Sequence, residues 1–358
     1  IAPVGGLSVL ANAAPISLGG GGPDYVETIT LNGDLKIGGD SATHIYGLIT
    51  GSGGLIKDGT GALVVTVSEY MNDFAGDVIL NDGLLVLNGF DTDPMQNPTG
   101  NVLGQGDIHL HGGTLALTGM LNGGSEILNP IQTIYVGDGD GNRVTIDAAH
   151  VESQIDLGDG HFFDQYGAGL ETGEGHDLVF QNSFVLGYDT GTEIVAADLV
   201  IGNPTDADDL FVEFALADES NPVSSSMTLQ GVGVRHSLTA YAEVEIDQQI
   251  TGAGGLNITS DSTGMVLLVN TENDFAGGVE LNGGMLVVND SNQIGTSALG
   301  TGTFAIHGDA SDPSQVIVAG APTEIYYDNG WKNDANNAWD GSIGTVEIGN
   351  DVAMQGEF

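Results

Sequence analysis

Residues 49–55 read Ile-Thr-Gly-Ser-Gly-Gly-Leu, and residues 250–256 read Ile-Thr-Gly-Ala-Gly-Gly-Leu. The offset of 201 residues, from Gly51 to Gly252, also joins Asn-Asp-Phe-Ala-Gly at 72–76 to an identical run further along the chain. The same offset relates two runs with the pattern Leu-Asn-x-Gly-x-Leu-Val-x-Asn, at 80–88 and 281–289. The alignment of the two copies needs no gap over these 40 positions, so the chain contains an internal repeat. Such a repeat is the sequence signature of a stacked array of similar structural units.

Short apolar runs alternate with turn-forming residues around the repeat and throughout the chain. Runs such as 85–87 and 286–288 have the length and composition of strands, and Asn-Gly, Asp-Gly and Gly-Gly pairs provide tight turns. The 58 glycines follow no three-residue period, which excludes a collagen triple helix. No stretch sustains the 3.6-residue apolar period of a helix. The sequence therefore predicts an all-β protein.

The repeated motifs resemble the autotransporter-associated β-strand repeat family. The resemblance covers residues 49–118 and 250–308 and rests on these runs of the first copy: Ile49–Lys57, Gly59–Leu63, Asn72–Gly76, Asn81–Leu85 and Leu103-Gly104. The second copy departs from the family pattern in two places, with Ile258 in place of Lys57 and Ser260 in place of Gly59. Both copies have Asp-Phe-Ala-Gly where the family usually has an aromatic residue, Thr and Gly. The resemblance implies a right-handed parallel β-helix, a solenoid of the passenger type, on the outside of a bacterial cell.

A parallel stack of this kind makes specific predictions for the repeated side chains. Phe74 and Phe275 should lie inside the stack, together with the aliphatic residues. The side chains of Asn72, Asn81 and Asn88, and those of their copies, should stack at the corners and satisfy one another's amides. Rungs of about 20–25 residues would give about 14–18 rungs and a rod about 70–85 Å long at the usual strand spacing.

The repeat also divides the chain into five predicted segments. They are N-terminal rungs at 1–48, the first repeat at 49–120, divergent rungs at 121–248, the second repeat at 249–320, and the start of a further, truncated unit at 321–358. The chain begins at Ile1 without Met and stops where another repeat is due, so we expect a segment of a longer surface protein. An open last rung would also allow chains to pair head to tail.

Charge and composition limit the partners. The chain has 49 acidic and 5 basic residues, a net charge of −44, so it repels nucleic acids and anionic membranes. The simplest interpretation is a solvated anionic surface, and the alternative is divalent-cation binding or a high-salt environment. The absence of Cys is compatible with an extracellular protein that does not rely on disulfides. No apolar run approaches the 20 or so residues of a membrane-spanning helix, so we expect no membrane insertion of this segment.

Several runs have side chains that could bind a metal ion. Asp138-Gly-Asp-Gly-Asn142 places three oxygen ligands on one loop, as Ca²⁺ prefers, but Arg143 and Ala149 stand where an EF-hand loop needs Gly and Glu. The acidic runs at 206–209 and 333–340 are less specific still. His109 and His111 alternate on one predicted strand, so they can share a face, which would suit a metal. No third ligand is evident, and the simpler interpretation is a surface pair. We therefore predict no resident cofactor and assign no metal ligand, with structural calcium as an alternative.

No catalytic residue is assigned either, and we predict that the chain is not an enzyme. Ser52 lies in the repeated turn and is Ala253 in the copy, which argues against a nucleophile. Two aromatic pairs at 326–327 and at 331 with 339 are candidates for an interaction surface that stacks sugars or contacts a neighbouring chain.

The expected function is a non-catalytic extracellular fibre, sheath, stalk or adhesin scaffold at the bacterial cell surface. Its expected partners are other copies or neighbouring repeats of a longer chain, and possible targets are glycans or other cells. The alternative is a glycan-binding or glycan-cleaving β-helix that uses paired carboxylates, which the many acidic residues leave open.

Overall fold

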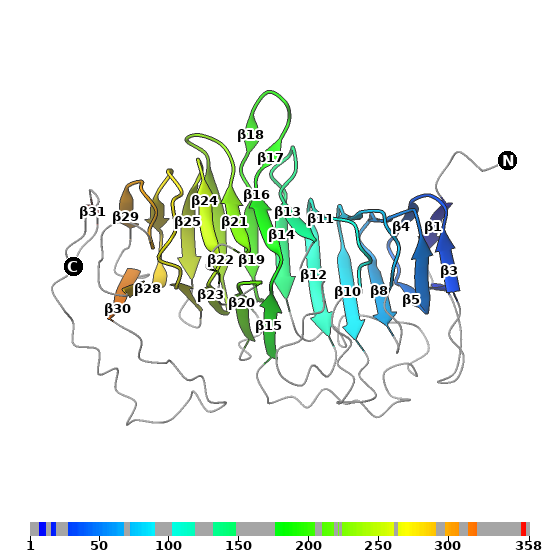
Figure 1. The fold of residues 1–358 in the computed structure, drawn as a ribbon. Helices are drawn as coiled ribbons and strands as arrows, with labels where there is room; N and C mark the ends of the chain where they lie inside the picture. Colours follow the sequence, from blue (N-terminus) through cyan, green and yellow to red (C-terminus); the bar gives the residue numbers. More distant parts are fainter. Residues whose placement is uncertain are drawn as a thin grey trace.

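The protein is an all-β structure of stacked parallel sheets (Figure 1). The computed structural model describes residues 7–11, 16–18, 28–67, 72–89, 102–118, 132–147, 176–204, 210–217, 221, 224–260, 264–290, 298–307, 314–320 and 352–355. Within these ranges there is no helix. The prediction of an all-β protein is confirmed.

Two long sheets and two shorter ones contain all the strands of the stack. Sheet A has nine strands in the order β1 (Leu7–Ala11), β4 (Leu35–Gly39), β7 (Leu55–Lys57), β9 (Val78–Leu80), β11 (Ile108–Leu110), β13 (Thr133–Val136), β16 (Ser183–Leu186), β21 (Ser226–Leu229) and β24 (Gln249–Gly252). Sheet B has twelve strands: β2 (Ile16–Leu18), β5 (Thr43–Tyr46), β8 (Ala62–Val67), β10 (Leu84–Gly89), β12 (Gly113–Thr118), β14 (Arg143–Asp147), β19 (Asp198–Ile201), β22 (Arg235–Ala240), β25 (Gly255–Ser260), β27 (Val279–Leu281), β29 (Phe304–His307) and β31 (Val352–Gln355).

The third side of the stack is formed by two smaller sheets. Sheet C pairs β3 (Thr28–Leu31) with β6 (Leu48–Gly51). Sheet D has six strands: β15 (His176–Phe180), β20 (Leu210–Phe214), β23 (Glu243–Ile246), β26 (Met265–Leu268), β28 (Gly284–Asp290) and β30 (Ser314–Gly320). Every described strand pair is parallel except the hairpin β17 (Tyr188–Asp189) and β18 (Ile194–Val195).

The chain visits the three sides in turn, and one such circuit is called a rung. From β4 it passes to β5, then to β6, and returns to sheet A at β7, directly beside β4. Residues 72–76 occupy the third side of the next rung, where Asp73 N–H donates to Ile49 O at 3.0 Å. Successive rungs therefore bond main chain to main chain, as parallel strands require.

Some of the described rungs are longer than we predicted. The length of a rung is the sequence separation between residues that face each other on adjacent strands. It is 20 residues between Arg235 and Gly255, but 55 residues between Arg143 and Asp198. Sheet B has twelve strands, which at the usual strand spacing form a stack about 50 Å long. The described part of the chain therefore shows fewer rungs than the roughly 14–18 predicted for the whole chain, because some of its rungs exceed the length found in the repeat.

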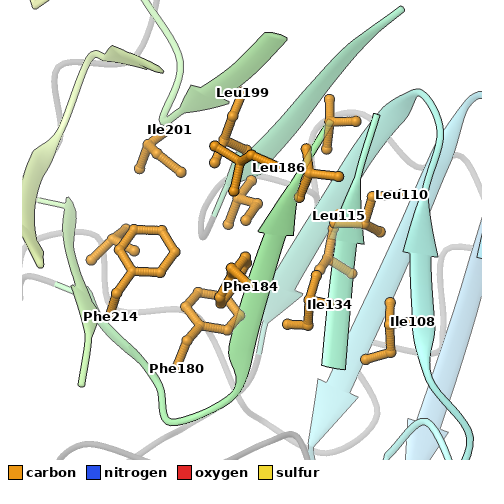
Figure 2. Close-up of a cluster of buried hydrophobic side chains, with 14 of the residues drawn as sticks. Ile108, Leu110, Leu115, Ile134, Phe180, Phe184, Leu186, Leu199, Ile201 and Phe214 are labelled. Carbon is orange, nitrogen blue, oxygen red and sulfur yellow. The ribbon is translucent and has the colours of Figure 1, made fainter. Parts of the chain in front are cut away.

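Strand alternation places one set of side chains between the sheets. In β13 and β16, for example, buried and half-buried residues alternate, so that every second side chain enters the core. Figure 2 shows part of this core, where Phe180, Phe184 and Phe214 turn toward one another. Phe184 and Phe214 meet edge to face with ring centroids 4.9 Å apart, the favourable geometry for aromatic pairs.

The two sequence repeats have the same local structure. Phe74 and Phe275 are both fully buried, as predicted. A glycine with positive φ lies against each ring: Gly104 has φ +70°, and an added Cβ would lie 2.5 Å from Phe74 O. At Gly300, where φ is +68°, an added Cβ would lie 2.4 Å from Phe275 O. Both glycines are therefore required by the close approach of the next rung.

A buried asparagine joins three successive rungs in each copy. The Asn72 side-chain oxygen accepts from Ile49 N–H at 2.7 Å, and its Nδ2 donates to Val102 O at 2.7 Å. The Asn273 side chain accepts from Ile250 N–H at 2.7 Å and donates to Ala298 O at 3.0 Å. The prediction that these amides bond one another was wrong, because the main chain of the adjacent rungs uses both ends of each amide.

Asn81 makes a different set of contacts, and its copy does not reproduce them. Its Nδ2 donates to Asp58 Oδ1 at 2.6 Å, and its Oδ1 contacts His111 Nδ1 at 2.9 Å. Asn282, the copy of Asn81, is exposed. The side chains at 88 and 289 lie outside the described residues.

Two substitutions distinguish the second copy from the first at this corner, Ile258 in place of Lys57 and Ser260 in place of Gly59. Lys57 is 2% exposed, and its Nζ donates to three carbonyl oxygens, those of Asp58, Gly59 and Asp82, at 2.6–3.0 Å. Burial lowers the pKa of Lys57 to about 8, against the opposing effect of Asp82 and Asp58. In the second copy, Ile258 fills the core position and the Ser260 hydroxyl accepts from Met285 N–H at 2.8 Å. The buried hydroxyl of Ser260 in the second copy thus takes the place of the buried Lys57 ammonium in the first.

The second copy lies one side further around the stack than the first. β6 belongs to sheet C, whereas its counterpart β24 belongs to sheet A. Likewise β7 and β9 are in sheet A while β25 and β27 are in sheet B, and β8 and β10 are in sheet B while β26 and β28 are in sheet D. Equivalent residues of the two copies therefore face different directions.

Candidate functional site

The hairpin β17–β18 is the clearest irregularity in the described stack. It lies between β16 of sheet A and β19 of sheet B, and it extends beyond the neighbouring strands (Figure 1). The turn 230–234 packs beside it, since a Cβ added to Gly231 would lie 2.9 Å from Ile194 Cβ. We call the hairpin and this turn the hairpin lobe. Its Tyr188 and Val232, 38% and 90% exposed, are the exposed large apolar side chains of the described residues.

A row of aromatic and imidazole rings leads from sheet A to the hairpin lobe. His109 stacks on Tyr135 with ring centroids 4.8 Å apart and an interplanar angle of 7°. The His111 ring lies 6.1 Å from His109 and meets Tyr188 edge to face at 5.9 Å. The prediction that the two histidines share a face is confirmed. Because His109 and Tyr135 stack on each other, one face of each ring is covered within the protein.

The polar contacts of this row hold the imidazoles in place. His109 Nε2 lies 3.7 Å from Asp77 Oδ2, and His111 Nδ1 lies 2.9 Å from Asn81 Oδ1. Burial and the neighbouring His109 lower the pKa of His111, with Asp138 opposing them. Among the described residues, no group of three or more His, Asp or Glu side chains is arranged to hold a metal ion.

In the loop at 138–142, the carboxylate of Asp138 accepts hydrogen bonds from other groups of the same loop. Asp138 Oδ1 accepts from the N–H groups of Asp140 and Asn142 at 3.0 and 2.9 Å, and Oδ2 accepts from Asn142 Nδ2 at 2.5 Å. Partial burial alone would raise the pKa of Asp138, but these hydrogen bonds lower it. The geometry is that of an Asx turn, in which the side chain caps its own loop.

Four acidic side chains gather on the outer surface of sheet D. Glu213 and Glu245 face each other on adjacent strands, and Glu243 and Asp247 lie two residues to either side of Glu245. On the next strand, Leu267 lies opposite Glu245. Burial, followed by the charges of the other three acids, raises the pKa of Glu245 to about 8. The cluster therefore holds a proton at neutral pH, which is the property that a general acid needs.

Replacing Glu245 by Gln should stabilise the protein at alkaline pH. The folded-state pKa lies above the ordinary value, so the folded state binds more protons than the unfolded state between about pH 4.3 and 8, and stability falls as pH rises through that window. We expect Glu245→Gln to raise the free energy of unfolding by about 1–3 kcal/mol at about pH 9 and to change it little at about pH 4.5.

Urea denaturation at the two pH values checks this expectation. Glu193→Gln, on the exposed tip of the hairpin, is the matched control and should be neutral at both. A Glu245→Gln variant no more stable than the wild type at alkaline pH would contradict the assignment of a half-buried, proton-holding carboxyl.

Of the other sequence candidates, Ser52 is the one that lies within the described residues. Ser52 is exposed in its repeated turn, and its N–H donates to Leu31 O at 2.8 Å. The acidic run 206–209, the aromatic residues Tyr326, Tyr327, Trp331 and Trp339, and the run 333–340 lie outside the described residues. Sequence reasoning missed Glu245 and the hairpin lobe. The alternation Glu243-Val-Glu-Ile246 signalled a strand with an acidic outer face, but not which strands would flank it.

Comparisons with protein-family models, with curated proteins and with solved structures gave no match. Within the described ranges, no helix long and apolar enough to cross a membrane was found.

Proposed function

We propose that the chain is a right-handed parallel β-helix, a solenoid in which each rung contributes one strand to each of three sides. The return of the chain to the adjacent position of the same sheet supports this proposal, as at β4 and β7. Parallel strands joined by a crossover take the right-handed connection in about 98% of cases, which supports the handedness.

The proposed function is that of a non-catalytic extracellular scaffold at the bacterial cell surface, as a fibre, sheath, stalk or adhesin. The observation that carries it is the three-rung bridge made by Asn72 and repeated by Asn273. Such bridges make each rung depend on its neighbours, as a mechanically continuous rod requires. The resemblance of the repeat to autotransporter passengers supports the location.

The proposed partners are other copies of the chain, or neighbouring repeats of a longer chain, with glycans or other cells as possible targets. The net charge of −44 opposes nucleic acid and anionic lipid as partners. We propose no resident cofactor; a structural calcium ion is the alternative, and calcium-dependent thermal stability would reveal it.

The alternative function, glycan cleavage, would draw on Glu245 as the acid of a carboxylate pair. Electron microscopy of the purified chain, run beside a reducing-sugar assay on a panel of polysaccharides, distinguishes the two. We expect rods of uniform width that associate end to end or side by side, and no sugar release. Discrete monomers that release sugar, with release abolished in Glu245→Gln, would contradict the proposal.

A further inference from the structure

His236 lies in the core directly beneath the hairpin lobe. It is on β22 and fully buried, and its ring contacts Ala197, which follows the hairpin, and Gln230 in the adjacent turn. A Cβ added to Gly187, the residue before the hairpin, would lie 2.8 Å from His236 Cε1 and 3.1 Å from Ile194 Cγ2. With φ of +110°, Gly187 is the residue that lets the chain pass over the ring.

Two main-chain hydrogen bonds fix one neutral form of the ring. The N–H of Ala197, two residues after the hairpin, donates to His236 Nδ1 at 3.1 Å. His236 Nε2 therefore carries the proton and donates to Gln230 O, 2.9 Å away at the start of the turn 230–234. One ring thus ties the exit of the hairpin and the adjacent turn to the same strand.

A second proton on the ring is incompatible with this arrangement. It would sit on Nδ1 and face the Ala197 N–H, so that two donors would oppose each other in a buried site. Burial lowers the pKa of His236, and the hydrogen bond to Gln230 O opposes that effect. Because the unfolded state then binds the proton more readily, the stability that the neutral ring provides is present above about pH 6.5 and is lost as pH falls below it.

The charged groups of the surrounding elements point away from the ring. Arg235, on the same strand, faces outward and pairs with Glu280, its Nε 3.1 Å from Oε1. On the hairpin, Asp189 and Glu193 are exposed. On β19, Asp198 pairs with Arg143 at 2.9 Å. The proton on the ring would therefore have no carboxylate counterion among these described groups.

We propose that His236 is an acid-sensitive latch that holds the hairpin lobe against the stack at neutral pH and releases it when the ring is protonated. The hairpin depends on this attachment, because it is a two-stranded ribbon, and such a ribbon is marginally stable when nothing packs against it. The released lobe carries Tyr188 and Val232, the exposed large apolar side chains of the described residues. Acid therefore changes the position of these two side chains relative to the sheets.

The test is amide hydrogen exchange of residues 188–197 at about pH 7 and about pH 4.5, corrected for the intrinsic rate at each pH. The matched variant is His236→Asn, whose side-chain oxygen retains an acceptor for Ala197 N–H but does not titrate. In the wild type we expect protection of the hairpin to fall about tenfold or more in acid while β16 and β21 keep theirs. In His236→Asn we expect hairpin protection to change little with pH.

Two further measurements keep the test decisive. The His236 ring signal in an NMR titration of the wild type should move at the same midpoint as the loss of hairpin protection. His109→Gln, at a half-buried imidazole of the ring row, should behave as the wild type does. Equal protection at both pH values, an equal loss in His236→Asn, or a ring that stays neutral throughout the transition would overturn the proposal.

Discussion

Replacing Asn72 by Ala should lower the free energy of unfolding by about 2–5 kcal/mol, because two buried main-chain groups lose their partners at once. These are the N–H of Ile49 in one rung and the carbonyl of Val102 two rungs further on. Asn273→Ala should have an effect of the same size, since its amide makes the equivalent pair of bonds. Urea denaturation followed by far-ultraviolet circular dichroism measures both changes.

Asn282→Ala is the matched control for this pair. Asn282 is exposed, and its main-chain N–H, which the substitution leaves in place, donates to Ile258 O at 2.8 Å. We expect a change within about 0.5 kcal/mol. Asn72→Ala as mild as Asn282→Ala would show that the amide does not bridge the rungs.

The second large effect is expected at the buried phenylalanines. Phe74→Ala and Phe275→Ala should each destabilise the protein by about 3–5 kcal/mol, since each leaves a cavity against a glycine that has no side chain to fill it. The next rung is held in place by its own main chain, with Gln105 N–H bonded to Phe74 O at 2.9 Å and Thr301 N–H to Phe275 O at 2.8 Å. The stack therefore cannot collapse into the cavity without losing these bonds.

Tyr188→Ala is the control for aromatic truncation, because that ring is partly exposed and belongs to the hairpin lobe. We expect a loss well below that of either phenylalanine variant in the same urea titration. If Phe74→Ala unfolded at the wild-type midpoint, its ring would not be part of the core. Unequal effects at Phe74 and Phe275 would indicate that the two copies differ in packing as well as in position.

The repeat predicted local structure well because the same residues recur at the same spacing in both copies and make the same contacts with the adjacent rungs. The inward position of Phe74 and Phe275 was predictable from the shared motif, and the common face of His109 and His111 from the alternation of side chains along a strand. The sequence offset did not predict that the second copy would lie one side further around. The side on which the second copy lies depends on how many strands the residues between the two copies form. The sequence does not reveal this number, because the loops between strands can vary widely in length at a small cost in entropy.

The contacts that define the candidate site come from residues far apart in sequence. Glu245 is perturbed by Glu213, which lies opposite it only because β20 pairs with β23. His236 meets Ala197, 39 residues earlier. Neither pairing leaves a local pattern, because strand register in a parallel stack is set by whole rungs rather than by hairpin turns. The prediction that the asparagine amides bond one another failed for a related reason. Buried main-chain N–H and C=O groups at the corners also need hydrogen-bond partners, and the buried amides provide them.

The central claim is that successive rungs stack as in-register parallel strands, with the two copies on different sides. Engineered cysteine pairs test it directly, since the chain has no Cys of its own. Thr50 and its copy Thr251 occupy the same place in the repeat, but Thr50 faces Thr30 in sheet C and Thr251 faces Thr228 in sheet A. The Thr30 and Thr50 hydroxyl oxygens are 3.4 Å apart, and facing residues on adjacent strands have the spacing that a disulfide needs.

We predict that Thr30→Cys with Thr50→Cys, and Thr228→Cys with Thr251→Cys, will each form an intramolecular disulfide under mild oxidation of the folded protein. The exchanged pairs, Thr30→Cys with Thr251→Cys and Thr228→Cys with Thr50→Cys, should remain reduced under the same conditions. Disulfides in the exchanged pairs, or none in the matched pairs, would contradict the stacked arrangement.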